Sequence, residues 1–272
     1  MTQFVVFIAS LLIAGAQQPQ ASPASTPVAT TATITAPTAK IWIGREQEFE
    51  DFLVSAPIEK FEEVKVGVTK PRRGHFAPGG VAASIVFKPL PPGRPSGFFE
   101  SYKSEIAAYR LDRLLQLGMV PPTVEKRHKH EIGSAQLWVE GCVWLKAKTE
   151  GGQRAPNISS WNRQVQRQRV WDNLTANIDR NQGNLLVDEG WNLILIDHSR
   201  AFTNSMKMPF PMYKIDRPLF ERLKALTREE IEAQMKGLLF DGPKSLLKRR
   251  DRIVQHFETL IQQRGEAVVI TE

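Results

Sequence analysis

Three side-chain oxygen donors lie close together in the segment 172–202, which reads DNLTANIDRNQGNLLVDEGWNLILIDHSRAF. Asp179 and Asn184 flank a tight DRNQGN loop, and Asp197 ends the apolar run LILID. A carboxylate that ends a buried strand usually faces a cleft, and carboxylate and amide oxygens are hard ligands that suit Mg²⁺. Asp179 is then free to accept the proton of a hydroxyl nucleophile. These are groups that phosphoryl transfer requires.

Further groups of such a site occur upstream in the matching order. Lys88 ends the strand pattern IVFK, where its ammonium would meet nucleotide phosphates, and Glu105 lies in the next predicted helix, where it would pair with Lys88. The loop at 69–80 contains Gly79 and Gly80 as well as Gly74, and we expect it to cover the phosphates. Each element alone is common in proteins, since a lysine after a strand usually faces solvent. Their joint order is what favours a nucleotide-dependent phosphotransferase.

The elements that must position these residues follow from hydrophobic periodicity and turn residues. We expect strands at 85–87, 133–141, 185–187 and 193–196, and helices at 100–118, 161–178 and 243–263. In the helix 161–178, Trp171, Leu174 and Ile178 are among the residues predicted to face inward. Thr227 and Glu230 have the spacing of a capping box, which predicts another helix start. The chain therefore has a strand-rich first half with one inserted helix and a helix-rich second half.

Several of these motifs resemble the phosphatidylinositol 3/4-kinase-like branch of the protein-kinase-like fold. GSAQLWVEG (133–141) looks like the hinge-proximal strand of type II phosphatidylinositol 4-kinases, IDRNQGN is similar to their catalytic loop, and LILIDHSRAF to their metal motif. FKP followed by KSEIAAYRLDRLL and VPP looks like the secretory-pathway kinases, and HipA-type bacterial kinases share the Asp, Asn and Asp layout. The resemblance implies an α+β, two-lobed protein-kinase-like fold, with an antiparallel β N-lobe that carries one helix and a helical C-lobe.

The resemblance also implies roles by position. Lys88 would bind the α- and β-phosphates of ATP, with Glu105 holding its ammonium in place. Asp179 would be the catalytic acceptor, and Asn184 and Asp197 would hold Mg²⁺, with Mn²⁺ as the alternative metal.

The adenine would meet the backbone of the segment that contains Val139 and Glu140, with Trp138 nearby. Arg180 would support the catalytic loop. The expected activity is transfer of the γ-phosphoryl group to a hydroxyl of a protein, an inositol lipid or a sugar. A catalytically inactive nucleotide-binding pseudokinase or scaffold is the alternative.

The N-terminal 39 residues carry no charged side chain. Positions 4–16 form an apolar run that would span about 20 Å as a helix, short of a bilayer core of roughly 30 Å. We therefore predict a secretory signal peptide at 1–16, with an uncleaved membrane anchor as the alternative, and an extracytoplasmic domain. The Pro-, Ala-, Ser- and Thr-rich stretch 17–39 reads as a disordered linker. The kinase-like domain would occupy 40–272, with an N-lobe at about 40–140 and a C-lobe at about 141–272.

Composition narrows the remaining classes of function. A single cysteine excludes an intrachain disulfide and a Cys-rich zinc site. The net charge of +7 and the runs Arg163–Arg169 and 244–252 raise nucleic-acid binding as a third hypothesis. No aromatic residues are interleaved with these arginines in the way that single-strand binding requires. We therefore favour a solvated basic face, which would equally steer an acidic acceptor or the head groups of a membrane surface.

Overall fold

The computed structural model describes residues 38–64, 71–94 and 97–272, which belong to one compact unit. The predicted signal peptide or anchor at 1–16 lies outside the described residues, as does the predicted linker up to residue 37. The last two linker residues are part of the folded unit, because the Thr38 hydroxyl and the Ala39 N–H donate to Asp188 Oδ2 at 3.1 and 2.9 Å. Across these three ranges, no helix has the length and apolar character needed to cross a membrane.

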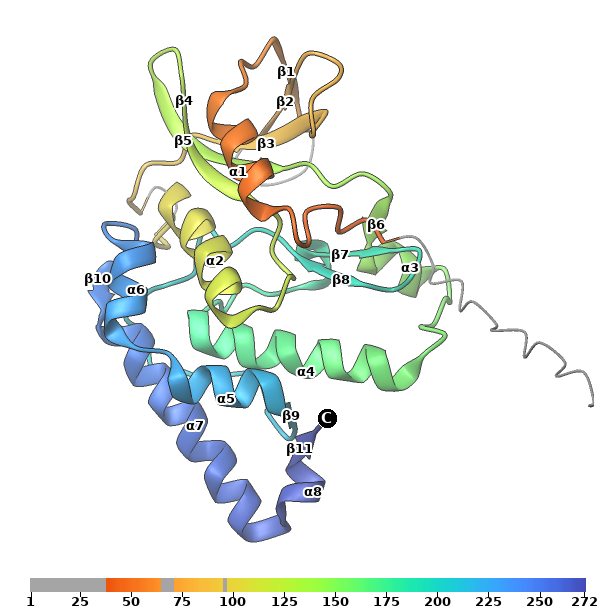
Figure 1. The fold of residues 1–272 in the computed structure, drawn as a ribbon, viewed down its shortest axis with the longest axis vertical. Coiled ribbons are helices and arrows are strands. Elements are labelled where there is room, and N and C mark those ends of the chain that lie inside the picture. Colours follow the sequence, from red (N-terminus) through yellow and green to blue (C-terminus); the bar gives the residue numbers. More distant parts are fainter. Residues whose placement is uncertain (1–37, 65–70, 95–96) are drawn as a thin grey trace, which may run out of the picture. The chain divides into compact units, whose positions relative to one another are not determined.

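The N-lobe is built on a five-stranded antiparallel sheet in the order β1-β2-β3-β5-β4 (Figure 1). Its strands are β1 (Lys60–Glu63), β2 (Arg72–His75), β3 (Ser84–Lys88), β4 (Thr123–His128) and β5 (Glu131–Leu137). The central strand β3 is almost wholly buried, as its IVF pattern predicts. Strand β2 lies inside the segment 69–80, which the sequence predicted to be a loop.

Helix α2 (Tyr102–Leu115) packs on this sheet and is the predicted N-lobe helix, with shorter bounds. The Ser101 side chain caps its first turn, and Gln116 ends it in a left-handed conformation with φ 56°. A second helix, α1 (Glu46–Ser55), was not predicted, because Arg45 provides no side-chain cap to mark its start. Tertiary contacts stabilise it instead: the buried Glu50 accepts hydrogen bonds from Tyr109 and Arg110 of α2 at 2.8 and 2.7 Å.

The C-lobe is mainly helical. Its helices are α3 (Leu145–Glu150), α4 (Ile158–Thr175), α5 (Arg217–Ala225), α6 (Arg228–Met235), α7 (Lys244–Arg264) and α8 (Glu266–Val269). The predicted capping box of Thr227 and Glu230 begins α6. Helix α4 ends at Ala176, which adopts a left-handed φ of 54°, so Ile178 lies beyond the helix and is 56% exposed. The prediction that Ile178 faces inward was therefore wrong.

Small strands complete the C-lobe. They are β6 (Cys142–Trp144), β7 (Leu185–Asp188), β8 (Leu193–Leu195), β9 (Ile215–Asp216), β10 (Phe240–Pro243) and β11 (Ile270–Thr271). The predicted hairpin is formed by β7 and β8, which pair antiparallel, and Figure 1 shows it between the N-lobe sheet and α4.

Strand β8 contributes to two apolar cores. Leu193 and Leu195 belong to the C-lobe core around α4 and α7, and Ile194 belongs to the N-lobe core. Because successive side chains of a strand point to opposite faces, this short run is buried on both sides. The strand therefore leads the chain to Asp197 along the boundary of the two cores.

Candidate active site

Lys88 is held between two carboxylates at the end of β3. Its Nζ donates to Glu105 Oε1 of α2 at 2.6 Å and to Asp197 Oδ1 at 2.8 Å. Lys88 and Glu105 are both buried, whereas the Asp197 side chain is one-third exposed. The structure therefore brings together three predicted site residues that lie 17 and 109 positions apart in the chain.

The charges of this cluster stabilise one another. Burial would lower the pKa of the Lys88 ammonium, but the neighbouring Asp197 and Glu105 outweigh it and hold that pKa well above its ordinary value. The Lys88 charge in turn lowers the pKa of Asp197 to about 2. Lys88 is therefore a fixed cation and Asp197 a fixed anion at neutral pH.

The turn after Asp197 ties this residue to helix α2. Asp197 itself has a φ of 59°, a strained conformation for a residue with a side chain. Its neighbours over-determine that conformation: the His198 N–H donates to Glu105 Oε2 at 2.9 Å, and the Ser101 N–H donates to the Ser199 carbonyl at 2.9 Å. Glu105 thus accepts from Lys88 with Oε1 and from the backbone N–H of His198, next to Asp197, with Oε2.

His198, the residue after Asp197, has a structural role. Its fully buried ring nitrogen Nε2 receives the Trp171 indole N–H at 3.1 Å and lies 3.0 Å from Arg180 Nη2. Both neighbours are donors, so Nε2 is the unprotonated acceptor. Burial, reinforced by the Arg180 charge, holds the pKa of His198 well below its ordinary value, and the ring is neutral.

Arg180 supports the loop at 179–184 through its hydrogen bonds. Its Nε contacts both oxygens of the buried Asp172 at 3.0 and 3.1 Å, and its Nη1 donates to the carbonyls of Asn184 and Ile196 at 2.7 and 2.9 Å. One guanidinium therefore connects α4, the loop and the end of the β7–β8 hairpin. This holds Asn184 and the residue before Asp197 at a constant separation.

Asn184 and Asp179 are oriented by this loop. The Asn184 amide Nδ2 donates to the Asp179 backbone carbonyl at 3.3 Å, which leaves Asn184 Oδ1 as the free acceptor. The Asp179 carboxylate is 46% exposed, and its Oδ2 accepts from Arg200 Nη1 at 3.1 Å. The sequence analysis did not single out Arg200, because nothing in the segment SRAF indicates that the Arg200 side chain contacts Asp179.

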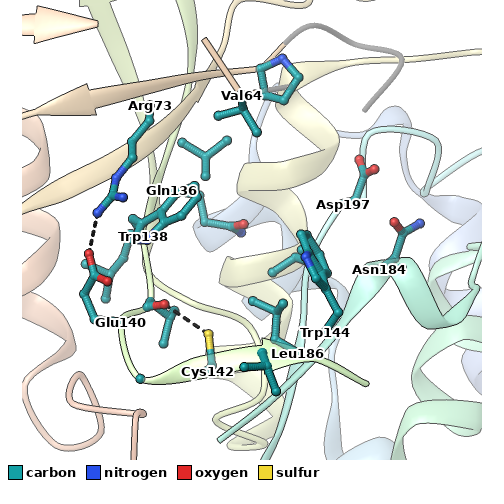
Figure 2. Close-up of a pocket in the computed structure, with 18 of the residues that line it drawn as sticks. Val64, Arg73, Gln136, Trp138, Glu140, Cys142, Trp144, Asn184, Leu186 and Asp197 are labelled. Atoms are coloured by element: carbon teal, nitrogen blue, oxygen red, sulfur yellow. Dashed lines mark hydrogen bonds and ion pairs between the residues drawn. The ribbon is translucent and has the colours of Figure 1, made fainter. Parts of the chain in front are cut away.

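A cavity of about 530 Å³ lies between the N-lobe sheet and the β6–β8 sheet. Figure 2 shows Asn184 and Asp197 on one side of it and Arg73, Trp138 and Glu140 on the other. The predicted residues that line it are Lys88, Trp138, Val139, Glu140, Asn184 and Asp197. Glu105 lies behind Lys88, and Asp179 is outside the lining. The cavity therefore has the oxygens of Asn184 and Asp197 on one side, and the aromatic ring of Trp138 with the Arg73–Glu140 ion pair on the other.

Among the lining residues that the sequence reasoning missed are Arg73 and Gln136. The Arg73 guanidinium carbon lies 4.1 Å from the centre of the Trp138 ring, and Arg73 also pairs with Glu140. Gln136 lines the cavity beside them and donates to Thr123 Oγ1 at 2.9 Å. Arg73 was missed because its segment was predicted to be a loop, although it alternates as a strand.

Gly79 and Gly80 do not line the cavity. They lie in the turn between β2 and β3, whereas the cavity meets the opposite end of β2 through Val64 and Pro71. A Cβ atom at Gly80 would come within 2.3 Å of the Phe52 ring, so packing against α1 explains that glycine. The prediction that Gly79 and Gly80 cover the phosphates is therefore corrected, because they lie at the end of the β2–β3 hairpin that is farther from the cavity. Gly74 lies within β2.

The site offers oxygen donors for a metal ion. Asp197 Oδ2 and Asn184 Oδ1 have no protein partner among the described residues. The same part of the chain contains no cluster of three His, Cys, Asp or Glu side chains that would bind a metal on its own. Two protein oxygens suit Mg²⁺ or Mn²⁺ shared with substrate phosphates, since Mg²⁺ usually keeps water and phosphate ligands.

The predicted basic face is partly internal. Arg167 pairs with Asp216 at 2.6 Å, and the fully buried Arg249 donates to the carbonyls of Leu174 and Thr203 at 2.6 and 2.8 Å. These arginines are used for packing and are not displayed to a polyanion.

Comparison with known proteins gives structural similarity without sequence similarity: no protein-family model and no curated protein matches the sequence. The crystal structure of the Golgi casein kinase aligns with a TM-score of 0.62 at 16% identity, covering 82% of this chain and 78% of that one. Hydra Fam20 with sugar aligns with a TM-score of 0.63 at 16% identity, covering 82% and 91%. The chain has a protein-kinase-like fold. The Helicobacter pylori proinflammatory kinase CtkA shares it at a TM-score of 0.53 and 13% identity, covering 77% and 98%.

Proposed function

We propose that this protein is an ATP- and Mg²⁺-dependent phosphotransferase that transfers the γ-phosphoryl group to a hydroxyl. The observation that carries the proposal is the pairing of Lys88 with Glu105 and Asp197 on the Asp197 side of the cavity. A buried lysine fixed between two carboxylates is ready to meet phosphate oxygens without reorganisation. Catalysis of this type consists mostly of positioning and charge stabilisation.

Each residue has a role in this reaction. The Lys88 ammonium neutralises charge on the nucleotide phosphates, and Asn184 and Asp197 hold the metal, which when bound offsets the charge of the phosphates. The carboxylate of Asp179 takes the proton of the acceptor hydroxyl while the hydroxyl oxygen forms its bond to the γ-phosphorus. The bond from that phosphorus to the β–γ bridging oxygen breaks, and ADP leaves. The side of the cavity that contains Trp138 binds the adenine base of ATP.

The comparisons support part of this proposal. The Golgi casein kinase has been solved with Mn/ADP bound, at a TM-score of 0.62 and 16% identity over 83% of this chain and 78% of that one. That structure is the reason to test Mn²⁺ beside Mg²⁺. We propose a protein or sugar hydroxyl as the first acceptor class. The phosphatidylinositol 3/4-kinase-like assignment rests on the motifs alone, so an inositol lipid is the second.

We also retain the location that the first 16 residues predict. A signal peptide would place the domain outside the cytoplasm, as a secretory kinase would require, whereas an uncleaved anchor would attach it to a membrane.

The test measures phosphate transfer by the full-length protein from γ-labelled ATP, with Mg²⁺ or Mn²⁺. Casein, a monosaccharide and phosphatidylinositol vesicles serve as acceptors. Turnover that Asp197→Ala abolishes and Asp179→Asn reduces to a small residual rate would establish the kinase, with Asp51→Asn on the exposed face of α1 as the folded control. ATP binding without turnover on any acceptor would favour the pseudokinase alternative. If Asp197→Ala keeps both its phosphate-transfer activity and its ATP binding, the proposed site is refuted.

A further inference from the structure

Arg200 connects the carboxylate of Asp179, the proposed proton acceptor, to the buried carboxylate of Glu100. Its Nη1 donates to Asp179 Oδ2 at 3.1 Å, and its Nε donates to Glu100 Oε1 at 2.8 Å. Its Nη2 lies 2.7 Å from the same Glu100 oxygen. The guanidinium carbon also lies 5.0 Å from the centre of the Phe98 ring. One planar group therefore makes three directed contacts and packs on an aromatic ring.

The anchor is rigid because Glu100 is only 3% exposed. Its backbone N–H and C=O pair with Gly93 at 2.9 and 3.0 Å. The Glu100 hydrogen bond raises the pKa of Arg200 above its ordinary value, so the guanidinium keeps its charge at any working pH. Arg200 is thus fixed at one end before it contacts Asp179.

Asp179 depends on this contact for its side-chain orientation. The loop amides of Asn181 and Asn184 donate to the Asp179 backbone carbonyl, not to its carboxylate. Among the described residues, Arg200 is the side chain that binds the carboxylate, and it binds Oδ2 alone. Oδ1 is left without a protein partner there, so it is the oxygen available to take a proton from an acceptor hydroxyl.

We propose that Arg200 is a positioning residue that orients the Asp179 carboxylate toward the acceptor hydroxyl. The inference rests on the proposed kinase activity and deepens it, because it assigns the second oxygen of Asp179 to proton transfer. A lysine cannot replace Arg200, because a single ammonium lacks the planar fork that reaches both carboxylates. Misplacing a reacting group by about 1 Å can cost roughly a hundredfold in rate.

The test is a comparison of kcat and the KM for ATP in the full-length protein. We expect Arg200→Lys to lower kcat about tenfold or more and to leave the KM for ATP unchanged, since Arg200 does not line the cavity. Glu100→Gln should lower kcat in the same direction by loosening the anchor. Arg217→Lys is the matched control, because Arg217 also bridges two carboxylates, Glu266 and Glu272, on an exposed surface.

A structural role is separated from positioning by a double variant. In an Asp179→Asn background, Arg200→Lys should lower the residual kcat by less than twofold, because the residue that it orients is already disabled. An equal loss in both backgrounds, or a single variant with wild-type kcat, would overturn the inference while leaving the kinase activity established. A wild-type protein without turnover on any acceptor would instead refute the proposed function, and this inference with it.

Discussion

Replacing Arg180 by methionine should destabilise the protein strongly and more at high pH than at low pH. Arg180 and Asp172 are 2% and 0% exposed, so this is a fully buried ion pair. The substitution removes both contacts to Asp172 and two hydrogen bonds to the carbonyls of Asn184 and Ile196. It leaves the Asp172 carboxylate buried without a compensating charge.

The size of the effect follows from this geometry. Removing one partner of a buried ion pair typically costs about 3–5 kcal/mol. For a unit of this size each kcal/mol lowers Tm by about 2–4 °C, so we expect a drop of about 6–20 °C at pH 8.

The pH dependence has a definite sign. Burial already holds the pKa of Asp172 above its ordinary value, against the opposing Arg180 charge. Without Arg180 that rise becomes larger. A carboxyl whose folded pKa is raised loses stability as the pH climbs from its unfolded pKa through its folded pKa. At pH 5 the carboxyl of the variant is more nearly neutral, so the drop in Tm should be smaller by several degrees.

Thermal unfolding followed by circular dichroism at pH 5 and pH 8 measures both quantities. Arg228→Met is the matched control, because Arg228 pairs with Glu232 on the exposed face of α6 and such pairs contribute about 0.5 kcal/mol or less. A drop in Tm for Arg180→Met that is no larger than the control, or equal at both pH values, would refute the reasoning.

Three further outcomes are expected. Cys142 lies in the cavity wall, and burial, with Glu140 and Asp188 nearby, raises its pKa to about 11. Iodoacetamide at pH 8.5 should therefore react with it roughly 160-fold more slowly than with a free thiol. ADP should slow the reaction further, and labelling at the rate of free cysteine would contradict this. Trp138→Ala should raise the KM for ATP about tenfold with little change in kcat, because it removes uniform binding; an unchanged KM would place the base elsewhere. Arg249→Met should lower Tm by about 6–12 °C, since it leaves one buried and two partly buried carbonyls without this donor. A melt like that of wild type would show that water replaces it.

The sequence was informative where the signal is local. The IVFK pattern predicted a buried strand that ends in Lys88, and the apolar LILI run predicted a strand that leads to Asp197. The spacing of Thr227 and Glu230 predicted a capping box that the structure contains. Such features depend on alternation and on residues three or four positions apart, which a single sequence displays directly.

Features that depend on distant partners could not be read in this way. Helix α1 carries no capping residue, and its Glu50 is neutralised by arginines of α2 some 60 positions later. Gly79 and Gly80 looked like a phosphate loop because nothing local says which end of a hairpin meets the cavity. Arg200 reaches Asp179 only because the turn after Asp197 directs it back toward the loop at 179–184.

The sequence by itself therefore determined the order of the elements that carry Lys88, Glu105, Asn184 and Asp197, and the residue types that phosphoryl transfer needs. The tertiary structure alone decided which of them meet: Lys88 contacts Glu105 and Asp197 across 17 and 109 positions, and the glycines do not join them. The physical reason is that strand and helix patterns arise from short-range sterics and burial. The site arises from the packing of two lobes around β8, where an alternation of one residue sends neighbouring side chains into different cores.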